Sequence, residues 1–210
     1  MSEELGKIEK PPVDSFSKPR KLIIAPLLFS GKDAPPDFAE IYNRCWNEII
    51  LQINKLEDRL GSVSVTYHEM IFTTGEEGIK MLEQLNPDSC KVIKSKTQKG
   101  AELQSTEDPE LALENVDWER CLMVAMGPKV RTKVLEFHTE SSLKRYEYVS
   151  KNIDETLKAD GIGLLFVREG HRTQFPQDIE VFNVYPPALD ELNRWLRDYT
   201  QKAGGTAPPA

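Results

Sequence analysis

Residues 161–167 read GIGLLFV, and this stretch decides the fold class because it is an uninterrupted apolar run that leads directly into Arg168–His171 (REGH). Such a run is typical of a strand that is buried on both faces of a parallel sheet. Lys21–Phe29 (KLIIAPLLF) is a second run of this kind near the start of the chain. Together the two runs predict a sheet that is covered by helices on both sides.

Three more strands and six helices are predicted from residue periodicity. Ser62–Phe72 alternates between apolar and polar residues, and the short apolar segments Cys121–Ala125 and Ile179–Tyr185 also indicate strands. Apolar residues three and four positions apart indicate helices. The predicted helices span residues 38–60, 73–85, 87–100, 110–115, 130–157 and 188–199. The longest of them either runs unbroken or breaks near Thr139–Ser142.

Strands that alternate with helices predict right-handed crossovers, and therefore a three-layer α/β fold with a mostly parallel five-stranded sheet. The last two strands are joined by a short link, Arg168–Asp178, which has too few residues for a regular crossover helix. They form either an antiparallel hairpin with a wide loop or a compressed parallel connection. One α/β domain is expected over residues 21–200, with a flexible tail over 1–20 and a disordered tail over 201–210.

Composition argues against several classes of function. The formal net charge of −7 gives no general attraction for nucleic acid or anionic lipid, so neither is expected as a partner. Cys45, Cys90 and Cys121 are far apart in the sequence, which indicates neither disulfides nor a thiolate zinc site. Because the chain has no apolar signal core and no run of about 18 apolar residues, we expect a soluble, cytoplasmic protein. Motifs of the well-marked nucleotide-binding and hydrolase classes are absent.

Polar side chains follow two of the predicted strands. Ligands of open α/β sheets bind outside the carboxyl ends of the strands, so a functional site is expected there. Glu69 lies near the end of the second strand, and Glu169 and His171 follow the strand at 161–167. By strand parity, Glu69 shares a face with the apolar residues of its strand, where an unpaired carboxylate would have a raised pKa or need a cation. Arg145, on the longest helix, is the predicted partner.

These residues also have purely structural interpretations. Glu69 would face water if its strand ended before it. His68 is interpreted as a solvated histidine on the polar face of the same strand. His171 is either an ordinary loop residue or a metal ligand or general base near Glu169.

The segment Arg145–Val167, followed by His171 and by Asp178–Val181, resembles the C-terminal part of TraB/TIKI-type proteins. In that family an arginine-bearing helix precedes a strand that ends in a Gly-x-x-His motif, and a further strand follows a short turn. The resemblance covers roughly a fifth of the chain. Arg168 stands where the motif has its glycine, and no such motif follows the first strand.

The resemblance implies metal-assisted hydrolysis, with Glu69, Glu169 and His171 as ligands of a divalent metal or as bases. Arg145 would be their charge partner. The first hypothesis is therefore an enzyme-like site in which these four residues act on a small polar or peptide-like substrate. The alternative is a non-catalytic binding or regulatory module that associates with another protein, or with itself as a homo-oligomer. The apolar surface for such association is expected around Trp195.

Overall fold

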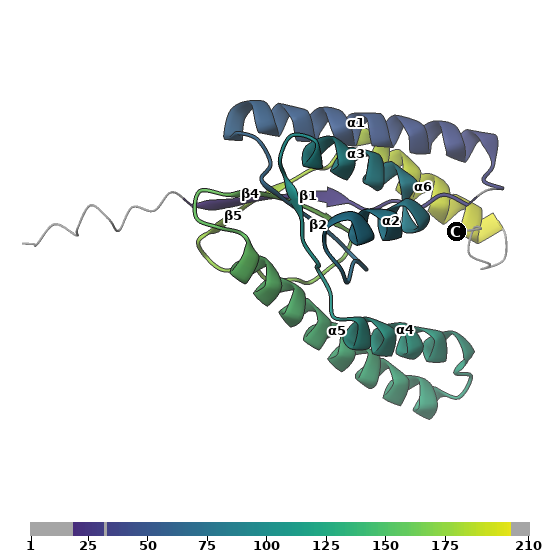
Figure 1. The fold of residues 1–210 in the computed structure, drawn as a ribbon. Coiled ribbons are helices and arrows are strands. Elements are labelled where there is room, and N and C mark those ends of the chain that lie inside the picture. Colours follow the sequence, from purple (N-terminus) through teal and green to yellow (C-terminus); the bar gives the residue numbers. More distant parts are fainter. Residues whose placement is uncertain (1–18, 32, 203–210) are drawn as a thin grey trace, which may run out of the picture.

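The computed structural model of the protein describes residues 19–31 and 33–202, and a five-stranded sheet forms its centre (Figure 1). The strands are β1 (Arg20–Pro26), β2 (Val65–His68), β3 (Glu102–Leu103), β4 (Ile162–Val167) and β5 (Ile179–Asn183). They lie in the order β3-β2-β4-β1-β5, and every neighbouring pair is parallel. The predicted parallel, five-stranded α/β fold is confirmed.

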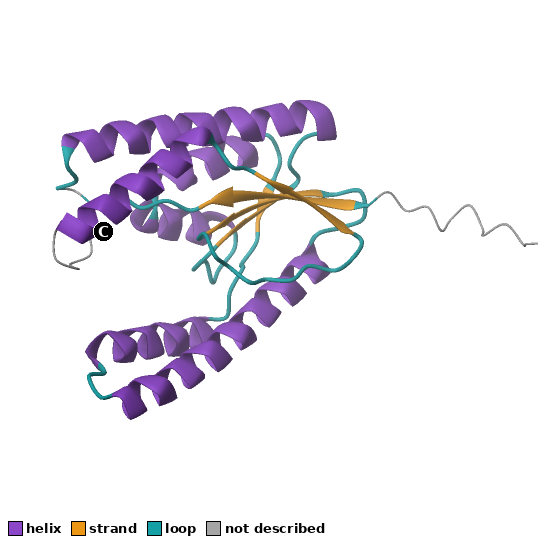
Figure 2. Ribbon diagram, turned by 180° about the vertical axis from the view of Figure 1, so that it is seen from behind, coloured by secondary structure: helices purple, strands orange, loops and turns teal. Residues whose placement is uncertain are grey.

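Helices form a layer on each side of this sheet (Figure 2). One side is covered by α1 (Pro36–Leu60), α2 (Gly75–Leu85), α3 (Pro87–Thr97) and α6 (Pro187–Lys202). On the other side, α4 (Pro109–Val124) leads into α5 (Pro128–Thr156), and only the second half of α5 lies on the sheet. The predicted three-layer arrangement is therefore also confirmed.

Alternate residues of the central strands point into two separate cores. Ile23 and Leu164 pack beneath α1 and its neighbours, whereas Leu22 and Leu165 pack against α5. All six residues of β4 are buried, as the GIGLLFV run predicts. Gly163 allows the strands to pack this closely, because a Cβ atom there would lie only 2.8 Å from Leu22 Cδ1.

The strand predicted over Cys121–Ala125 is wrong. Most of this segment is the last turn of α4, and the remaining strand of the sheet is β3, only two residues long. A short apolar segment is compatible with either a strand or a helix. Here the segment continues α4, whose first turn is capped by Asp108. The Asp108 carboxylate accepts hydrogen bonds from two backbone N–H groups of the first turn. The helix predicted over 110–115 is accordingly much longer.

Two further predictions need correction. β2 is shorter than the predicted Ser62–Phe72, and its polar side is not solvated, because Thr66 and His68 are fully buried. The alternative break near Thr139–Ser142 does not occur, since α5 is continuous. Thr139 Oγ1 instead donates to the Leu135 carbonyl oxygen in the preceding turn, which leaves the helix intact.

The short link between β4 and β5 is a parallel connection, and the antiparallel alternative is wrong. β4 and β5 lie on opposite sides of β1, and both run parallel to it. The link therefore passes back along the sheet without a helix. Phe175 packs on the same core as α5, and the Gln174 carbonyl oxygen accepts a hydrogen bond from Ser150 of that helix. The link thus covers part of the face that a crossover helix would otherwise cover.

The predicted tails over 1–20 and 201–210 fall almost entirely outside the described residues. Of the exceptions, Arg20 begins β1, while Gln201 and Lys202 end α6, so both boundaries shift slightly. Among the helices of the described ranges, none is both long and apolar enough to cross a membrane.

Candidate functional site

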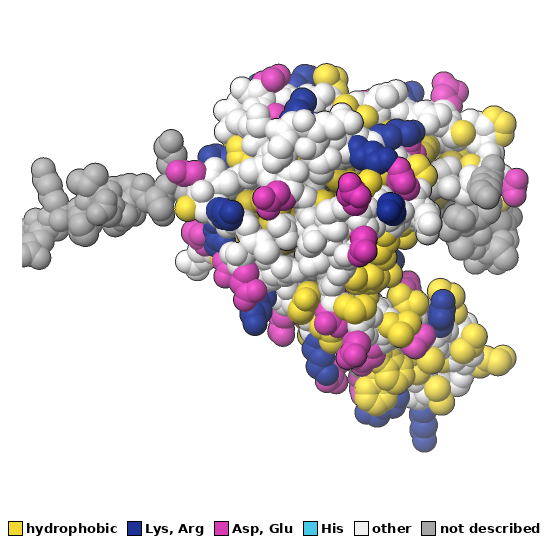
Figure 3. Space-filling view, in the orientation of Figure 1, with side chains coloured by type: hydrophobic (Ala, Val, Ile, Leu, Met, Phe, Trp, Pro, Cys, Tyr) yellow, Lys and Arg dark blue, Asp and Glu magenta, His cyan; other side chains and the backbone are white. Residues whose placement is uncertain are grey.

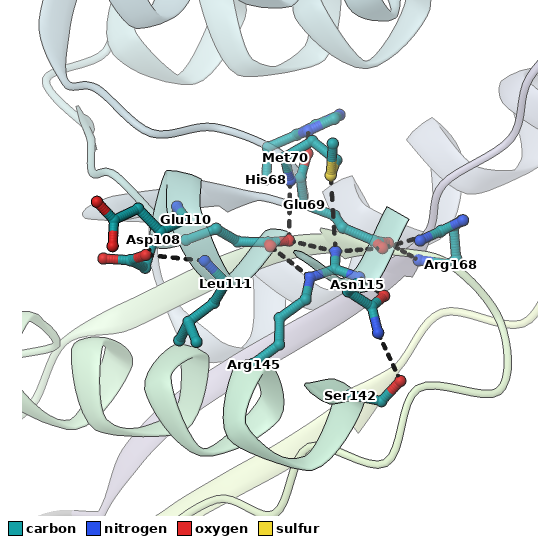
Figure 4. A network of polar contacts seen from close by, with 11 residues as sticks. His68, Glu69, Met70, Asp108, Glu110, Leu111, Asn115, Ser142, Arg145 and Arg168 are labelled. Carbon is teal, nitrogen blue, oxygen red and sulfur yellow. Dashed lines mark hydrogen bonds and ion pairs between the residues drawn. The ribbon is translucent and has the colours of Figure 1, made fainter. Parts of the chain in front are cut away.

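Four charged side chains from four parts of the chain meet at the carboxyl end of the sheet (Figure 4). Glu69 follows β2, Glu107 precedes α4, Arg145 lies on α5 and Arg168 follows β4. Arg145 Nη2 lies 2.7 Å from Glu69 Oε1 and 2.6 Å from Glu107 Oε1. Arg168 Nε lies 2.8 Å from Glu69 Oε1. The predicted pairing of Glu69 with Arg145 is confirmed. We call these four residues the charge cluster.

Backbone groups complete the charge cluster. The N–H of Arg168 donates to Glu69 Oε2 at 2.7 Å, and the N–H of Met70 donates to Glu107 Oε1 at 2.9 Å. Met70 adopts a positive φ of 67°, so the chain turns sharply as it leaves β2. Both carboxylates are therefore held by charged and backbone donors.

The electrostatics of the charge cluster favour the charged forms of Glu69 and Arg145. Burial would raise the pKa of Glu69, but the charges of Arg168 and Arg145 outweigh it and hold this pKa below its ordinary value. Burial likewise opposes the charge of Arg145, but hydrogen bonds and ion pairs with Glu107 and Glu69 raise its pKa. Two carboxylates thus balance two guanidinium groups. Because both Glu69 oxygens already accept hydrogen bonds, this carboxylate is poorly placed to act as a general base.

The charge cluster leaves almost no room for a substrate. The cavity beside Glu69, Glu107 and Arg145 has a volume of about 10 Å³, no more than a single water molecule requires. The geometry therefore describes a buried clamp that joins α5 and the start of α4 to the sheet.

His68 lies next to the charge cluster but points into the opposite face of the sheet. Its Nδ1 is 2.5 Å from the Glu69 carbonyl oxygen, which can only accept, and its Nε2 is 2.9 Å from Ser89 Oγ on α3. Burial lowers the pKa of His68 to about 4. The interpretation of His68 as a solvated residue is wrong, and the structure places a neutral, hydrogen-bonded imidazole there.

Of the four predicted site residues, Glu169 does not join the others. Its carboxylate accepts a hydrogen bond from Asn193 of α6, at 2.8 Å on the exposed surface. His171 lies on the link, and burial lowers its pKa although the charge of Glu69 opposes this. Its Nδ1 atom is buried and has no hydrogen-bond partner among the described residues. The structure thus brings together Glu69 and Arg145, with His171 near them.

The predicted metal ligands Glu69, Glu169 and His171 do not form a shared site. Glu69 is occupied by arginine, and Glu169 is bonded to α6. Within residues 19–31 and 33–202, no group of three or more His, Cys, Asp or Glu side chains is arranged to hold a metal ion.

Several larger hollows lie away from the charge cluster. A groove of about 630 Å³ lies between α2 and β3, and none of the predicted site residues lines it. A smaller groove of about 230 Å³ lies along α5 beside the link, where His138, Ser142, Tyr146 and Arg172 line it. Of the link residues, Arg172, which follows His171 in the chain, lines this second groove.

Helix α4 and the first half of α5 form an antiparallel hairpin that projects from the body of the molecule (Figure 1). We call residues 109–143 the helical hairpin. Inside it, the rings of Trp118 and Phe137 stack with centroids 4.8 Å apart, and Asn115 Nδ2 donates to Ser142 Oγ at 2.7 Å. The charge cluster anchors its base, because Glu107 directly precedes α4 and Arg145 directly follows the hairpin.

The helical hairpin carries an unusual share of exposed apolar surface. Eight of the thirteen exposed large apolar side chains of the described chain belong to it, although it is a small part of the molecule. Apolar side chains gather over it in Figure 3. Met126 is 97% exposed, Val124 76% and Met123 75%. The others are Leu113, Val130, Leu135, Phe137 and Leu143.

The chain matches no protein-family model, and comparisons with curated proteins and with solved structures also found no match. The resemblance to TraB/TIKI-type proteins therefore stays a prediction. The function has to be inferred from the geometry of the molecule itself.

Three features of the molecule are not predictable from the sequence patterns alone. In the sequence, Glu107 is recognisable only as part of the segment that caps the helix at 110–115. Arg168 is recognisable only as the residue that replaces the glycine of the Gly-x-x-His motif. An association surface is predicted around Trp195, whose ring packs 5.0 Å from that of Phe38 and whose Nε1 donates to Asp37. Most exposed large apolar side chains of the described residues lie on the helical hairpin instead. The apolar run from Cys121 to Met126, followed by Gly127 and Pro128, was the available signal for the helical hairpin.

Proposed function

We propose that this protein is a non-catalytic association module that binds another polypeptide through the apolar surface of its helical hairpin. The observation that supports the proposal is the concentration of exposed large apolar side chains on this one projecting element. Contiguous exposed apolar surface of this kind marks interaction sites in soluble proteins. We expect the association to take place in the cytoplasm.

The construction of the helical hairpin supports this function. Two packed helices bury one stripe of each helix against the other and leave the remaining faces exposed. Polar residues on those faces would let the hairpin face water without a partner, but Met123, Val124 and Met126 are apolar and exposed. The firm anchor at the charge cluster presents this surface in a fixed orientation, which reduces the entropic cost of binding.

The proposal predicts that a neutral polar replacement of the hairpin surface abolishes binding. The variant Met123→Gln, Val124→Gln, Met126→Gln and Val130→Gln keeps the charge and suits a helix. We expect it to lose about a hundredfold in affinity, because it removes several central apolar contacts. Proteins captured by the wild type from an extract of the source cells would be identified by mass spectrometry. Each would then be purified and its affinity measured by calorimetry.

The matched control replaces exposed apolar residues elsewhere on the molecule. Ile50 and Leu51 of α1 are 38% and 52% exposed, and the variant Ile50→Gln and Leu51→Gln should bind every partner as the wild type does. Equal binding by the hairpin variant and the wild type, for all purified partners and for the protein itself, would contradict the proposal. Circular dichroism confirms that each variant is folded.

A second candidate function is acid–base chemistry on, or binding of, a small polar molecule or peptide beside His171. The observation in its favour is the buried Nδ1 atom of His171, which has no hydrogen-bond partner among the described residues. The next residue, Arg172, lines the groove along α5. Arg172 and His138 in this groove would suit a carboxylate or phosphate group. The candidate does not depend on Glu169, which lies elsewhere, or on a metal held by the predicted ligands.

This candidate predicts a ligand-dependent rise in melting temperature. Small carboxylates, inorganic phosphate and short peptides would be tested by thermal denaturation. A true ligand at a hundred times its dissociation constant should raise Tm by about 5 °C or more. The variants His171→Gln and Arg172→Ala should abolish the rise. If no member of the panel shifts Tm, or if the variants respond like the wild type, this candidate is wrong.

A further inference from the structure

We infer that the partner of the helical hairpin is a second copy of this chain, and that the two hairpins pack antiparallel, the tip of each lying against the base of the other. This inference rests on the proposed function, because it names the occupant of the same surface. The observation that supports the inference is the distribution of charge along the hairpin.

The two ends of the helical hairpin have opposite charge. From Pro109 to Glu119, over its base and middle, α4 carries four carboxylates and no Lys or Arg, and Arg120 is the first basic residue of the helix. Residues 124–135, at the tip, carry three basic residues and no Asp or Glu. The basic residues are Lys129, Arg131 and Lys133, and all three are exposed. The acidic residues Glu110, Glu114 and Asp117 are exposed as well, with Glu119 half-buried.

This arrangement is complementary to itself in one orientation. A parallel pair of hairpins would place one basic tip against the other, which is repulsive. A two-fold axis across the middle of the hairpin instead brings each basic tip to the acidic base of the partner. The opposite charges then meet twice, once on each side of the axis. Complementary charge of this kind fixes orientation and suppresses wrong partners.

Apolar and charged residues would have separate roles in the pair. The exposed apolar residues Met123, Val124 and Val130 lie at the tip end, and Leu113 lies near the base. Antiparallel packing would therefore bring apolar side chains of one copy over those of the other along the whole hairpin. Four helices packed in this way form a bundle, in which the faces left exposed in a single hairpin become a core. α4 has 16 residues, or about 24 Å of helix, over which the copies can make contact.

Two charge-reversal variants test this inference on the purified full-length protein. The tip-reversed variant is Arg131→Glu with Lys133→Glu, and the base-reversed variant is Glu110→Lys with Glu114→Lys, both exposed residues near the start of α4. In an antiparallel pair, each variant alone brings like charges together at both contacts. An equimolar mixture restores opposite charges at both contacts, because the acidic tip of one meets the basic base of the other. A parallel pair would also gain opposite charges in the mixture, but its wild type would already have like charges at both ends. Only the antiparallel pair therefore predicts both that each variant associates more weakly than the wild type and that the mixture recovers.

Sedimentation velocity from about 0.1 to 100 μM would measure self-association, since this range covers dissociation constants near micromolar. We expect a concentration-dependent wild-type dimer, at least about tenfold weaker self-association for each variant, and recovery in the mixture to within about threefold. The wild-type dimer should also weaken with added salt. The control variant, Lys55→Glu with Arg59→Glu on α1, makes an equal change of charge on exposed residues and should behave as the wild type.

Four results would overturn the inference. A wild type that stays monomeric over the whole range shows that the partner is not a second copy, while the glutamine variant still decides whether the hairpin binds a different protein. Variants that dimerise like the wild type, or a mixture that does not recover, show that the hairpins do not pair tip to base. If a variant fails to fold, the salt dependence of the wild-type dimer still tests the charge pairing, because added salt weakens a dimer with opposite charges in contact and strengthens one with like charges in contact. A wild-type dimer that strengthens with salt would overturn the antiparallel arrangement.

Discussion

Replacing Arg145 with methionine is expected to lower the free energy of unfolding by about 3–5 kcal/mol, because it leaves two buried carboxylates without their shared cation. The Arg145 side chain is 7% exposed, and those of Glu69 and Glu107 are 7% and 1% exposed. Arg168 can still compensate Glu69, but Glu107 loses its only ion-pair partner among the described side chains. Denaturation by urea, followed by circular dichroism, measures the loss.

Two further variants show whether the loss comes from unpaired charge. Adding Glu69→Gln and Glu107→Gln to Arg145→Met removes the uncompensated carboxylates, and we expect this to recover about half of the lost stability. Arg44 pairs with Glu191 on the surface, where both side chains are 46% exposed. Arg44→Met should therefore cost no more than about 1 kcal/mol. A loss below that amount for Arg145→Met would show that the charge cluster is not a stabilising clamp.

Acidification is expected to destabilise the protein through His68 by about 3 kcal/mol between pH 6.5 and pH 4. Burial lowers the pKa of this histidine to about 4 in the folded protein, from an ordinary value of 6.5. Between these values the unfolded chain binds a proton that the folded protein excludes, so stability falls as the pH falls. Above pH 6.5 both states are neutral, and the stability that the neutral imidazole provides is fully present.

The variant His68→Gln isolates this contribution, since glutamine keeps a donor and an acceptor but does not titrate. The difference in unfolding free energy between wild type and variant should be nearly constant above pH 7. It should then move by about 3 kcal/mol in favour of the variant as the pH falls to 4. His171 and Glu69 contribute equally to both proteins and cancel in the difference. A difference that is independent of pH would mean that His68 is not buried as a neutral group.

Particular residues show where sequence reasoning works for this chain. The GIGLLFV run identified β4 as a strand buried on both faces, because its own composition allows no solvent-facing side. Strand parity placed Glu69 on the same face as the apolar residues of its strand, and the need of a buried carboxylate for a cation identified Arg145 as its partner. Those inferences needed only local periodicity and the cost of an unpaired charge.

Other residues show where it fails. His68 was placed on a solvated face because its neighbours in the strand are hydroxyl-bearing, yet α3 covers that face and Ser89 is its partner. Cys121–Ala125 was read as a strand because five apolar residues fit either a buried strand or a helix. Glu169 was grouped with His171 although a hydrogen bond draws it to α6. In each case the deciding contact came from a segment distant in sequence.

The sequence by itself determined the α/β class, the parallel sheet, most helices and the Glu69–Arg145 pair, because periodicity and the cost of buried charge act along or near the chain. Only the tertiary structure decided that β5 lies beside β1, that Glu107 and Arg168 complete the charge cluster, and that α4 and α5 project as a hairpin with an apolar surface. The physical reason is that burial is a property of the assembled fold. Burial of an apolar side chain is favourable. The sequence of one chain does not tell which surface, of this chain or of a partner, will bury it.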